Sequence, residues 1–233
     1  MKASLVIPCF NESKSLPELL KKCENAFYGK DIEVIIVDNG STDNTQEVLK
    51  ALLKHYSFVV SVKVEKNIGY GSGILHGLYC AKGEILGWTH ADLQTDPNDF
   101  NKGLIFFEEV KYKESIFVKG ERYGRPWFDV LFTKGMALFE SILMQTKMWD
   151  INAQPTLFHK SFFNSWHEPP HDFSLDLFVY FMAKRSKLLI KRFPVIFSER
   201  VHGNSKWNLG LLSKYRFIIR TLIYSISLKR RLK

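Results

Sequence analysis

The sequence has few cysteines and no long apolar run, and both shortages exclude classes of protein. Its 233 residues contain three cysteines, Cys9, Cys23 and Cys80, which are widely spaced and fit no metal-ligand pattern. We therefore expect reduced thiols packed within the fold rather than a disulfide framework. No apolar run reaches the roughly 18 residues of a membrane-spanning helix, and the stretch 3–8 is too short for the core of a signal peptide. The chain is expected not to cross a membrane, although it can lie on one.

Acidic residues are missing after Glu199, so positive charge gathers at the C-terminal end of the chain. The formal net charge is +9 at pH 7, which suits nucleic acid, nucleotide phosphates or anionic lipid as a partner. Nucleic acid is the weakest of these candidates, because no aromatic–basic recognition motif accompanies the charge. The basic residues of this end are Lys206, Lys214, Arg216, Arg220, Lys229, Arg230, Arg231 and Lys233.

The first half of the chain alternates short β-branched runs with amphipathic stretches, which predicts an α/β fold with a mostly parallel, doubly wound sheet. We expect strands at 3–8, 33–37, 58–64 and 84–89, and helices at 14–27, from a cap-like 41–43 to about 55, and at 70–81. The second half is less regular, with helices expected at 97–112 and 127–146, a strand at 187–197 and a basic amphipathic segment at 207–228. We expect one domain, in which 1–206 form the α/β unit and 207–233 its C-terminal helix.

Each strand of the first half runs into a group of polar residues. These groups are Asn11 with Glu12, residues 38–41, Asn67 with Gly69, and residues 90–92. In an open α/β sheet, ligands bind beyond the carboxyl ends of the strands. The four groups therefore predict one binding site at that edge.

Four blocks at these strand ends resemble the signature blocks of family-2 glycosyltransferases, which have the GT-A (Rossmann-like) fold. The blocks are 4–12 (SLVIPCFNE), 34–45 (VIIVDNGSTDNT), 66–77 (KNIGYGSGILHG) and 89–97 (THADLQTDP). The branch they resemble most is the group of dolichol-phosphate-mannose synthase and other polyprenyl-phosphate glycosyltransferases. The resemblance is strong over about 3–125 and can be traced to about Asn208.

The resemblance implies a site for a nucleotide-diphosphate sugar. Glu12 and Asp38 would accept hydrogen bonds from its ribose or base; the alternative for Asp38 is a helix-cap or turn residue. Gly69, Gly71 and Gly73 either admit the donor phosphates or serve a turn and helix packing. The donor-binding residues implied are Pro8, Phe10, Asn11, Glu12, Asp38, Asn67, Gly73, Ala91 and Asp92.

The resemblance also implies a divalent cation, Mg²⁺ or Mn²⁺, on the donor pyrophosphate. Relatives carry Asp-x-Asp followed by Gln two residues on, and this chain has His90 in place of the first carboxylate, followed by Asp92 and Gln94. Asp92 and Gln94 offer oxygen atoms suited to a hard cation. His90 either binds the metal and favours Mn²⁺, contacts a phosphate, or is held by hydrogen bonds at the strand end.

Basic residues of the second half match the acceptor side of the family. Arg122 belongs to a Gly-x-Arg expected after a fifth strand, and Arg125 follows it. Arg200, Ser205 and Lys206 belong to an Arg-x-x-Gly-x-Ser-Lys-like block. In polyprenyl-phosphate glycosyltransferases such residues gather phosphate oxygens, for which the arginine fork is suited. The alternative is that they are surface charges of a basic protein.

Three acidic residues are candidate general bases. Asp150 either orients an arginine or removes a proton from a hydroxyl acceptor. A phosphate acceptor needs no base, because its second pKa is about 6. Asp172 is a further candidate, as is Asp176, which lies in the apolar, helix-like stretch 173–182 and would otherwise pair with a buried lysine or arginine.

Taken together, these patterns predict an inverting, metal-dependent transfer of sugar from a UDP- or GDP-linked donor to a polyprenyl phosphate, without a covalent intermediate. The expected catalytic residues are Asp92, Arg122, Asp150, Arg200 and Lys206. Two alternatives stay open: transfer to a sugar hydroxyl with Asp150 as base, and a non-catalytic nucleotide-sugar-binding module. The C-terminal helix either lies on the anionic inner face of the cytoplasmic membrane, holding a cytoplasmic protein there, or packs on its own domain or a partner subunit.

Overall fold

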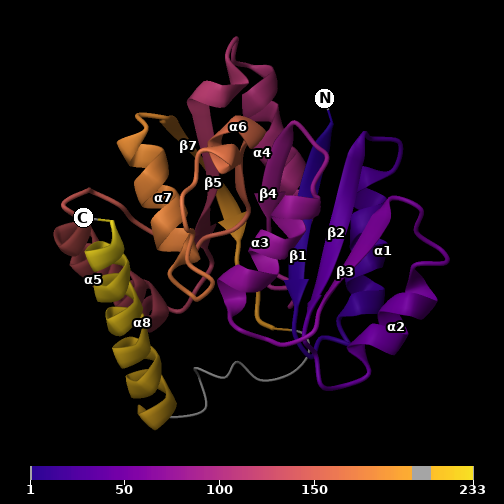
Figure 1. The fold of residues 1–233 in the computed structure, drawn as a ribbon, viewed down its shortest axis with the longest axis horizontal. Helices are drawn as coiled ribbons and strands as arrows, with labels where there is room; N and C mark the ends of the chain where they lie inside the picture. Colours follow the sequence, from indigo (N-terminus) through magenta and orange to yellow (C-terminus); the bar gives the residue numbers. More distant parts are fainter. Residues whose placement is uncertain (1, 201–210, 233) are drawn as a thin grey trace.

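The computed structural model describes residues 2–200 and 211–232, which fold around one seven-stranded sheet (Figure 1). The strands lie in the order β3-β2-β1-β4-β6-β5-β7. Their pairings are parallel except those of β6, which runs antiparallel to β4 and β5. The strands are β1 (Ala3–Cys9), β2 (Ile32–Asn39), β3 (Val59–Val64), β4 (Ile85–Trp88), β5 (Ile116–Tyr123), β6 (Thr156–His159) and β7 (Leu189–Ile196).

Helices cover both faces of the sheet, and each face has its own apolar core. On one face, α1 (Leu16–Phe27), α2 (Thr45–Leu52) and α4 (Asp99–Glu108) pack over residues such as Ile7 and Val34. On the other face, α3 (Tyr70–Cys80), α6 (Lys160–Asn164) and α7 (Leu175–Arg185) pack over residues such as Val6 and Ile35. Alternate residues of one strand thus serve opposite cores, which explains why β1 and β2 are apolar almost throughout.

Two further helices lie side by side at one end of the molecule, away from β3 (Figure 1). They are α5 (Trp127–Met144), which follows β5 along the chain, and α8 (Leu211–Arg231). Ser225 of α8 donates a hydrogen bond to the buried Glu140 of α5 at 3.1 Å. A short 3₁₀ helix, η1 (Lys113–Ser115), precedes β5. No helix along 2–200 and 211–232 combines the length and the apolar composition that crossing a bilayer requires.

The expected α/β fold with a mostly parallel sheet and a C-terminal helix is confirmed, whereas one strand was missed and three local expectations need correction. The antiparallel strand β6 was not predicted. The helix expected from 43 to about 55 is shorter, Thr45–Leu52, and Arg122 lies within β5 rather than after it. Cys80 is exposed, whereas Cys9 and Cys23 are buried as expected. The expected boundary at residue 206 lies outside the described residues.

Candidate active site

The loops beyond β1 and β2 are joined by hydrogen bonds at the carboxyl edge of the sheet. Asn11 accepts the backbone N–H of Thr42 at 2.8 Å, and its own backbone N–H donates to Ser41 Oγ at 3.0 Å. Asp38, at the end of β2, is buried and accepts the backbone N–H of Ser41 at 3.0 Å. Asp38 therefore has the turn role that was the alternative prediction for it. This contact uses only one of its two carboxylate oxygens, Oδ1.

Arg200 connects the first and fourth strand ends. Its Nη2 donates to Glu12 Oε1 at 3.0 Å and to Asp92 Oδ2 at 3.2 Å. Burial raises the pKa of Glu12, while the Ser15 hydroxyl and the Arg200 charge act in the opposite direction. Glu12 and Asp92 are thus brought together around one cation, as convergence of the strand ends predicts.

The predicted metal motif lies directly after β4 and is tied to the chain beyond β7. The backbone N–H of Gln94 donates to Asp92 Oδ1 at 3.2 Å, and Gln94 Nε2 donates to the Ser198 carbonyl at 3.1 Å. The His90 ring lies 5.7 Å from the ring of Tyr70, centroid to centroid. In the part of the chain that the structure describes, no three His, Cys, Asp or Glu side chains gather closely enough to hold a metal ion by themselves.

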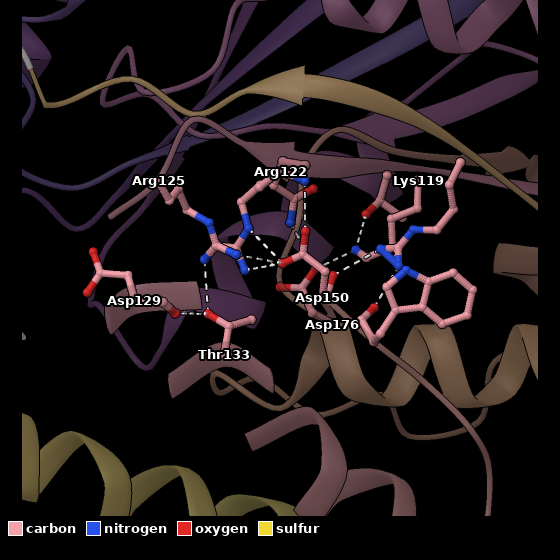
Figure 2. Close-up of polar contacts among 11 residues, drawn as sticks. Lys119, Arg122, Arg125, Asp129, Thr133, Asp150 and Asp176 are labelled. Carbon is pink, nitrogen blue, oxygen red and sulfur yellow. Dashed lines mark hydrogen bonds and ion pairs between the residues drawn. The ribbon is translucent and has the colours of Figure 1, made fainter. Parts of the chain in front are cut away.

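A cluster of charged residues surrounds Asp150, in the segment between α5 and β6 (Figure 2). Arg122 donates its backbone N–H to Asp150 Oδ2 and its Nε to Oδ1, each at 2.8 Å. Arg125 Nη2 lies 3.7 Å from Asp150 Oδ1, and its Nη1 donates to Thr133 Oγ1 at 2.9 Å. Burial by itself would raise the pKa of Asp150, but the charge and hydrogen bonds of Arg122 outweigh it and lower that pKa. Asp150 is therefore built to orient arginines, and a lowered pKa makes it a poor base at neutral pH.

A second buried cluster lies behind the first, around Asp176 of α7. Its Oδ1 accepts Gln154 Nε2 at 2.8 Å and lies 3.6 Å from Lys119 Nζ, which also donates to Thr156 Oγ1 at 2.8 Å. Burial lowers the pKa of Lys119 to about 8, although the Asp176 carboxylate raises it. The interpretation of Asp176 as the partner of a buried lysine is confirmed. Asp172 accepts the backbone N–H of Ser174 and so shapes the turn before α7.

One pocket of about 1180 Å³ joins the metal motif to the arginine cluster. Its charged and polar lining includes His90, Asp92, Gln94 and Arg200, together with Arg122 and Arg125. Helix α5 supplies much of the remaining wall, to which Thr221 of α8 also belongs. The apolar residues of the lining include Phe132, Met136, Ala137, Ile151, Phe173, Ile196 and Phe197.

The family model described as "Glycosyl transferase family 2" matches residues 4–187. The chain belongs to this family. It is therefore a glycosyltransferase, and the alternative of a non-catalytic module is set aside. An undecaprenyl-phosphate 4-deoxy-4-formamido-L-arabinose transferase from Edwardsiella ictaluri is 28% identical over an alignment 234 residues long with its gaps, which covers 97% of this chain and 69% of that protein. A dolichol-phosphate mannosyltransferase from Pyrococcus furiosus is 28% identical over an alignment of 244, which covers 100% of this chain and 67% of that protein.

Solved structures of the same fold include complexes with metal and nucleotide. The glucosyl-3-phosphoglycerate synthase of Mycobacterium tuberculosis, in complex with Mn²⁺, UDP-glucose and phosphoglyceric acid, has a TM-score of 0.71 and 18% identity, covering 98% of this chain and 79% of that one. A mannosyltransferase from Pyrobaculum calidifontis, in complex with GDP-mannose and Mn²⁺, has a TM-score of 0.67 and 19% identity, covering 88% and 58%. At these identities the likeness establishes the fold of the glycosyltransferase.

The predicted residues of the glycosyltransferase fall into three groups, apart from Asp150, which contacts Arg122 and Arg125 but is not among the residues that line the pocket. Those that line the pocket are His90, Asp92, Gln94, Arg122, Arg125 and Arg200. Those on the first strands, the neighbouring loops and helix α3 are Pro8, Phe10, Asn11, Glu12, Asp38, Asn67, Gly73 and Ala91, with Asn67 accepting the backbone N–H of Gly69 at 3.0 Å. Ser205 and Lys206 lie outside the described residues.

Close packing requires glycine at two of the three positions at the start of α3. A side chain at Gly69 would collide with the carbonyl of His171, and one at Gly71 would lie 2.6 Å from the carbonyl of Pro170. The backbone N–H of Gly71 donates to the Asp172 carbonyl at 3.2 Å. At Gly73, a Cβ would lie 3.0 Å from the side chain of Asn39, at the end of β2.

Four further residues of this region have no clear signal in the sequence: Lys119, Glu140, Gln154 and Arg192. A weak signal exists for Lys119, which follows the apolar run 116–118 in a buried strand. The other three carry no local pattern, because their partners lie far away along the chain.

Proposed function

We propose that this glycosyltransferase transfers a sugar from a nucleotide diphosphate to a polyprenyl phosphate at an anionic membrane surface. The observation that carries the proposal is that one pocket combines three kinds of lining. Asp92 and Gln94 offer oxygen atoms, Arg122, Arg125 and Arg200 offer positive charge, and apolar side chains come from α5 and from the chain around the end of β7. A metal-bound donor pyrophosphate, an acceptor phosphate and an isoprenyl chain require these three kinds of lining in one site.

The residues proposed to hold the donor fit a divalent cation. Asp92 and Gln94 supply oxygen ligands, His90 supplies an imidazole, and all three line the same pocket. When bound, the cation would neutralise the donor pyrophosphate as its bond to the sugar breaks. The two structural relatives, which are complexes with Mn²⁺ and a nucleotide sugar, support the proposal of a divalent cation at the donor.

The chemistry at the acceptor needs positioning rather than a base. A phosphate oxygen of the acceptor attacks the anomeric carbon while the bond from that carbon to the donor phosphate breaks. The nucleoside diphosphate leaves with the bonding electrons, so the configuration inverts in one step without a covalent enzyme intermediate. Arg122 and Arg125 would hold the acceptor phosphate, and Asp150 would hold Arg122 in turn. The names of the two curated relatives, both transferases to a polyprenyl phosphate, support this acceptor.

A rival proposal, transfer to a sugar hydroxyl, needs a base. The candidate for that role is Asp150, and its carboxylate is bound on both oxygens by Arg122 while its pKa is lowered. These contacts favour the phosphate acceptor.

The test is a transfer assay with labelled UDP- and GDP-linked sugars, Mg²⁺ or Mn²⁺, and two matched acceptors, undecaprenyl phosphate and undecaprenol. We expect label in the lipid phase with the phosphate and not with the alcohol. Asp92→Asn should lose at least about a hundredfold in turnover, as when a charge-stabilising group is removed, whereas Asp96→Asn on the exposed side of the same loop should remain active. Transfer to the alcohol, or to neither lipid, would refute the proposed acceptor.

A further inference from the structure

Arg192, in the middle of β7, reaches the peptide that carries Asp150. Its Nη1 donates to the carbonyl of Trp149 at 2.6 Å, and its Nη2 donates to the carbonyl of Asp150 at 3.0 Å. The guanidinium carbon lies 4.9 Å from the ring centroid of Trp149 and 5.5 Å from that of Tyr180 on α7. Two hydrogen bonds and two aromatic rings therefore fix the orientation of this one side chain.

The peptide that Arg192 holds needs support from outside. Asp150 has a φ of 44°, in the left-handed region that residues other than glycine seldom adopt. Such a conformation persists when neighbouring groups over-determine it. The carbonyl of Asp150 is bound by Arg192, and its side chain is bound by Arg122.

The carboxylate of Asp150 in turn holds two arginines of the pocket. One oxygen accepts the backbone N–H of Arg122, and the other accepts Arg122 Nε and lies 3.7 Å from Arg125 Nη2. Figure 2 shows Arg122 and Arg125 directed at this carboxylate from the same side. A shift of the Asp150 backbone would therefore move the groups that hold both pocket arginines in place.

We propose that Arg192 is a positioning residue for acceptor binding: it fixes the Trp149–Asp150 peptide so that Asp150 holds Arg122 and Arg125 toward a phosphate in the pocket. The inference rests on the proposed function only in naming the phosphate an acceptor. Arg192 does not belong to the pocket lining among the described residues, so its effect passes through Asp150.

The test uses Arg192→Lys, which keeps the charge but loses the planar fork and one hydrogen bond. Lys191→Ala is the matched control, because neighbouring residues of a strand face opposite sides of the sheet. Calorimetry would measure the affinity for farnesyl phosphate, a short isoprenyl monophosphate, and separately for UDP and GDP with Mn²⁺. Hydrogen exchange would follow the backbone amide of Arg122.

We expect Arg192→Lys to bind farnesyl phosphate about tenfold more weakly, as for the loss of one charged hydrogen bond, with nucleotide affinity within about twofold of the wild type. The Arg122 amide should exchange faster, and Lys191→Ala should match the wild type in every measurement. Adding Asp150→Asn to Arg192→Lys should cause little further loss, because both act through one carboxylate. Should Arg192→Lys fail to fold, Trp149→Leu removes one of the two rings and should give a smaller loss in the same direction.

Three results would overturn the inference: farnesyl phosphate binding and amide exchange that stay at wild-type values, equal weakening of nucleotide and farnesyl phosphate, or a wild type that binds no farnesyl phosphate. A different result would refute the proposed function. A wild type that binds farnesyl phosphate but transfers no sugar to undecaprenyl phosphate would refute the transfer, while the change in affinity of Arg192→Lys would still decide the role of Arg192.

Discussion

Arg200 forms an ion pair with Asp92, with 3.2 Å between Arg200 Nη2 and Asp92 Oδ2. Asp92 is the carboxylate assigned to the metal in the proposed mechanism, whereas Arg200 was predicted on the acceptor side. A divalent cation at Asp92 would meet the guanidinium on the same carboxylate. The two positive groups must therefore compete for it, and the contact with Glu12 strengthens the hold of Arg200.

The first prediction is that Arg200→Gln binds Mn²⁺ more tightly than the wild type when no nucleotide is present. Removing a competing cation from a partly exposed ion pair should increase the affinity about three- to tenfold. Calorimetry or Mn²⁺ paramagnetic resonance would measure it. Arg185→Gln, an exposed arginine at the end of α7, removes the same charge elsewhere and should leave the affinity unchanged. Weaker Mn²⁺ binding by Arg200→Gln would show that Arg200 supports the metal site instead of competing for it.

The second prediction concerns His90, which stands where relatives have a carboxylate. His90→Asp should shift the metal preference from Mn²⁺ toward Mg²⁺, because Mg²⁺ selects oxygen ligands and imidazole suits softer ions. The ratio of nucleotide affinities measured with each metal would report the shift. His76→Asp on α3, whose ring contacts the Ser72 carbonyl, is the control. An unchanged ratio in His90→Asp would mean that His90 does not bind the metal.

The third prediction separates the two roles of Asp150. As an anchor, Asp150→Asn should raise the KM for the acceptor phosphate about tenfold or more, since one charged partner of Arg122 is lost, and leave the pH profile of kcat unchanged. As a base, it should instead abolish kcat and remove the acidic limb of the profile. Asp129→Asn is the matched control, because Asp129 lines the same pocket while its carboxylate points away from Asp150 (Figure 2).

The donor side of this fold was predictable because its information is local. Each polar group directly follows a buried strand, and parallel topology brings the strand ends to one edge. The contact between Asn11 and Thr42, and that of Arg200 with Glu12 and Asp92, bear out this convergence. Helical periodicity likewise located α1 and α5 to within a few residues.

The features that were not predicted from the sequence depend on residues that are distant along the chain. Strand β6 has four residues and enters the sheet antiparallel, against the alternating order of the first half. The need for glycine at position 71 comes from the backbone of 170–172, which local sequence does not reveal. Nothing in the local sequence distinguishes Arg192 from other basic strand residues. Its contacts with the rings of Trp149 and Tyr180 arise only when the chain folds.

The fourth prediction concerns Glu140, the buried carboxyl that accepts Ser225 of α8. Burial raises the pKa of Glu140 from 4.5 to about 7, and the Ser225 hydrogen bond only partly offsets this. Between these pH values the unfolded chain releases the proton and the folded chain keeps it, so folding stability falls as pH rises through this window. Glu140→Gln should remove this loss, worth on the order of 2–3 kcal/mol between pH 5 and pH 8. Denaturant unfolding at both pH values would measure it, and an equal slope in wild type and variant would contradict it.

The last prediction tests the membrane surface through the exposed apolar faces of α5 and α8. Trp127, Phe128 and Leu131 at the start of α5 are 67%, 66% and 59% exposed, and Ile223 of α8 is 59% exposed. Single exposed apolar residues are ordinary, but a group of them on two adjacent helices marks an interaction surface. The same turns of α5 supply Asp129 and Phe132 to the pocket lining, so an isoprenyl chain would have a short path from a bilayer at this surface into the pocket.

Charge decides which bilayer this surface should prefer. The last turn of α8 carries Lys229, Arg230 and Arg231, and basic residues on a helix that also exposes apolar side chains such as Ile223 favour anionic lipid. Vesicles containing phosphatidylglycerol should therefore sediment the protein, and neutral phosphatidylcholine vesicles should do so far less. Phe128→Glu with Leu131→Glu should weaken binding to the anionic vesicles, whereas Ile105→Glu, an exposed aliphatic residue of α4 on the opposite face of the sheet, should not. If the double variant still binds these vesicles but loses transfer to undecaprenyl phosphate, α5 admits the acceptor chain and the basic end of α8 alone holds the protein at the surface.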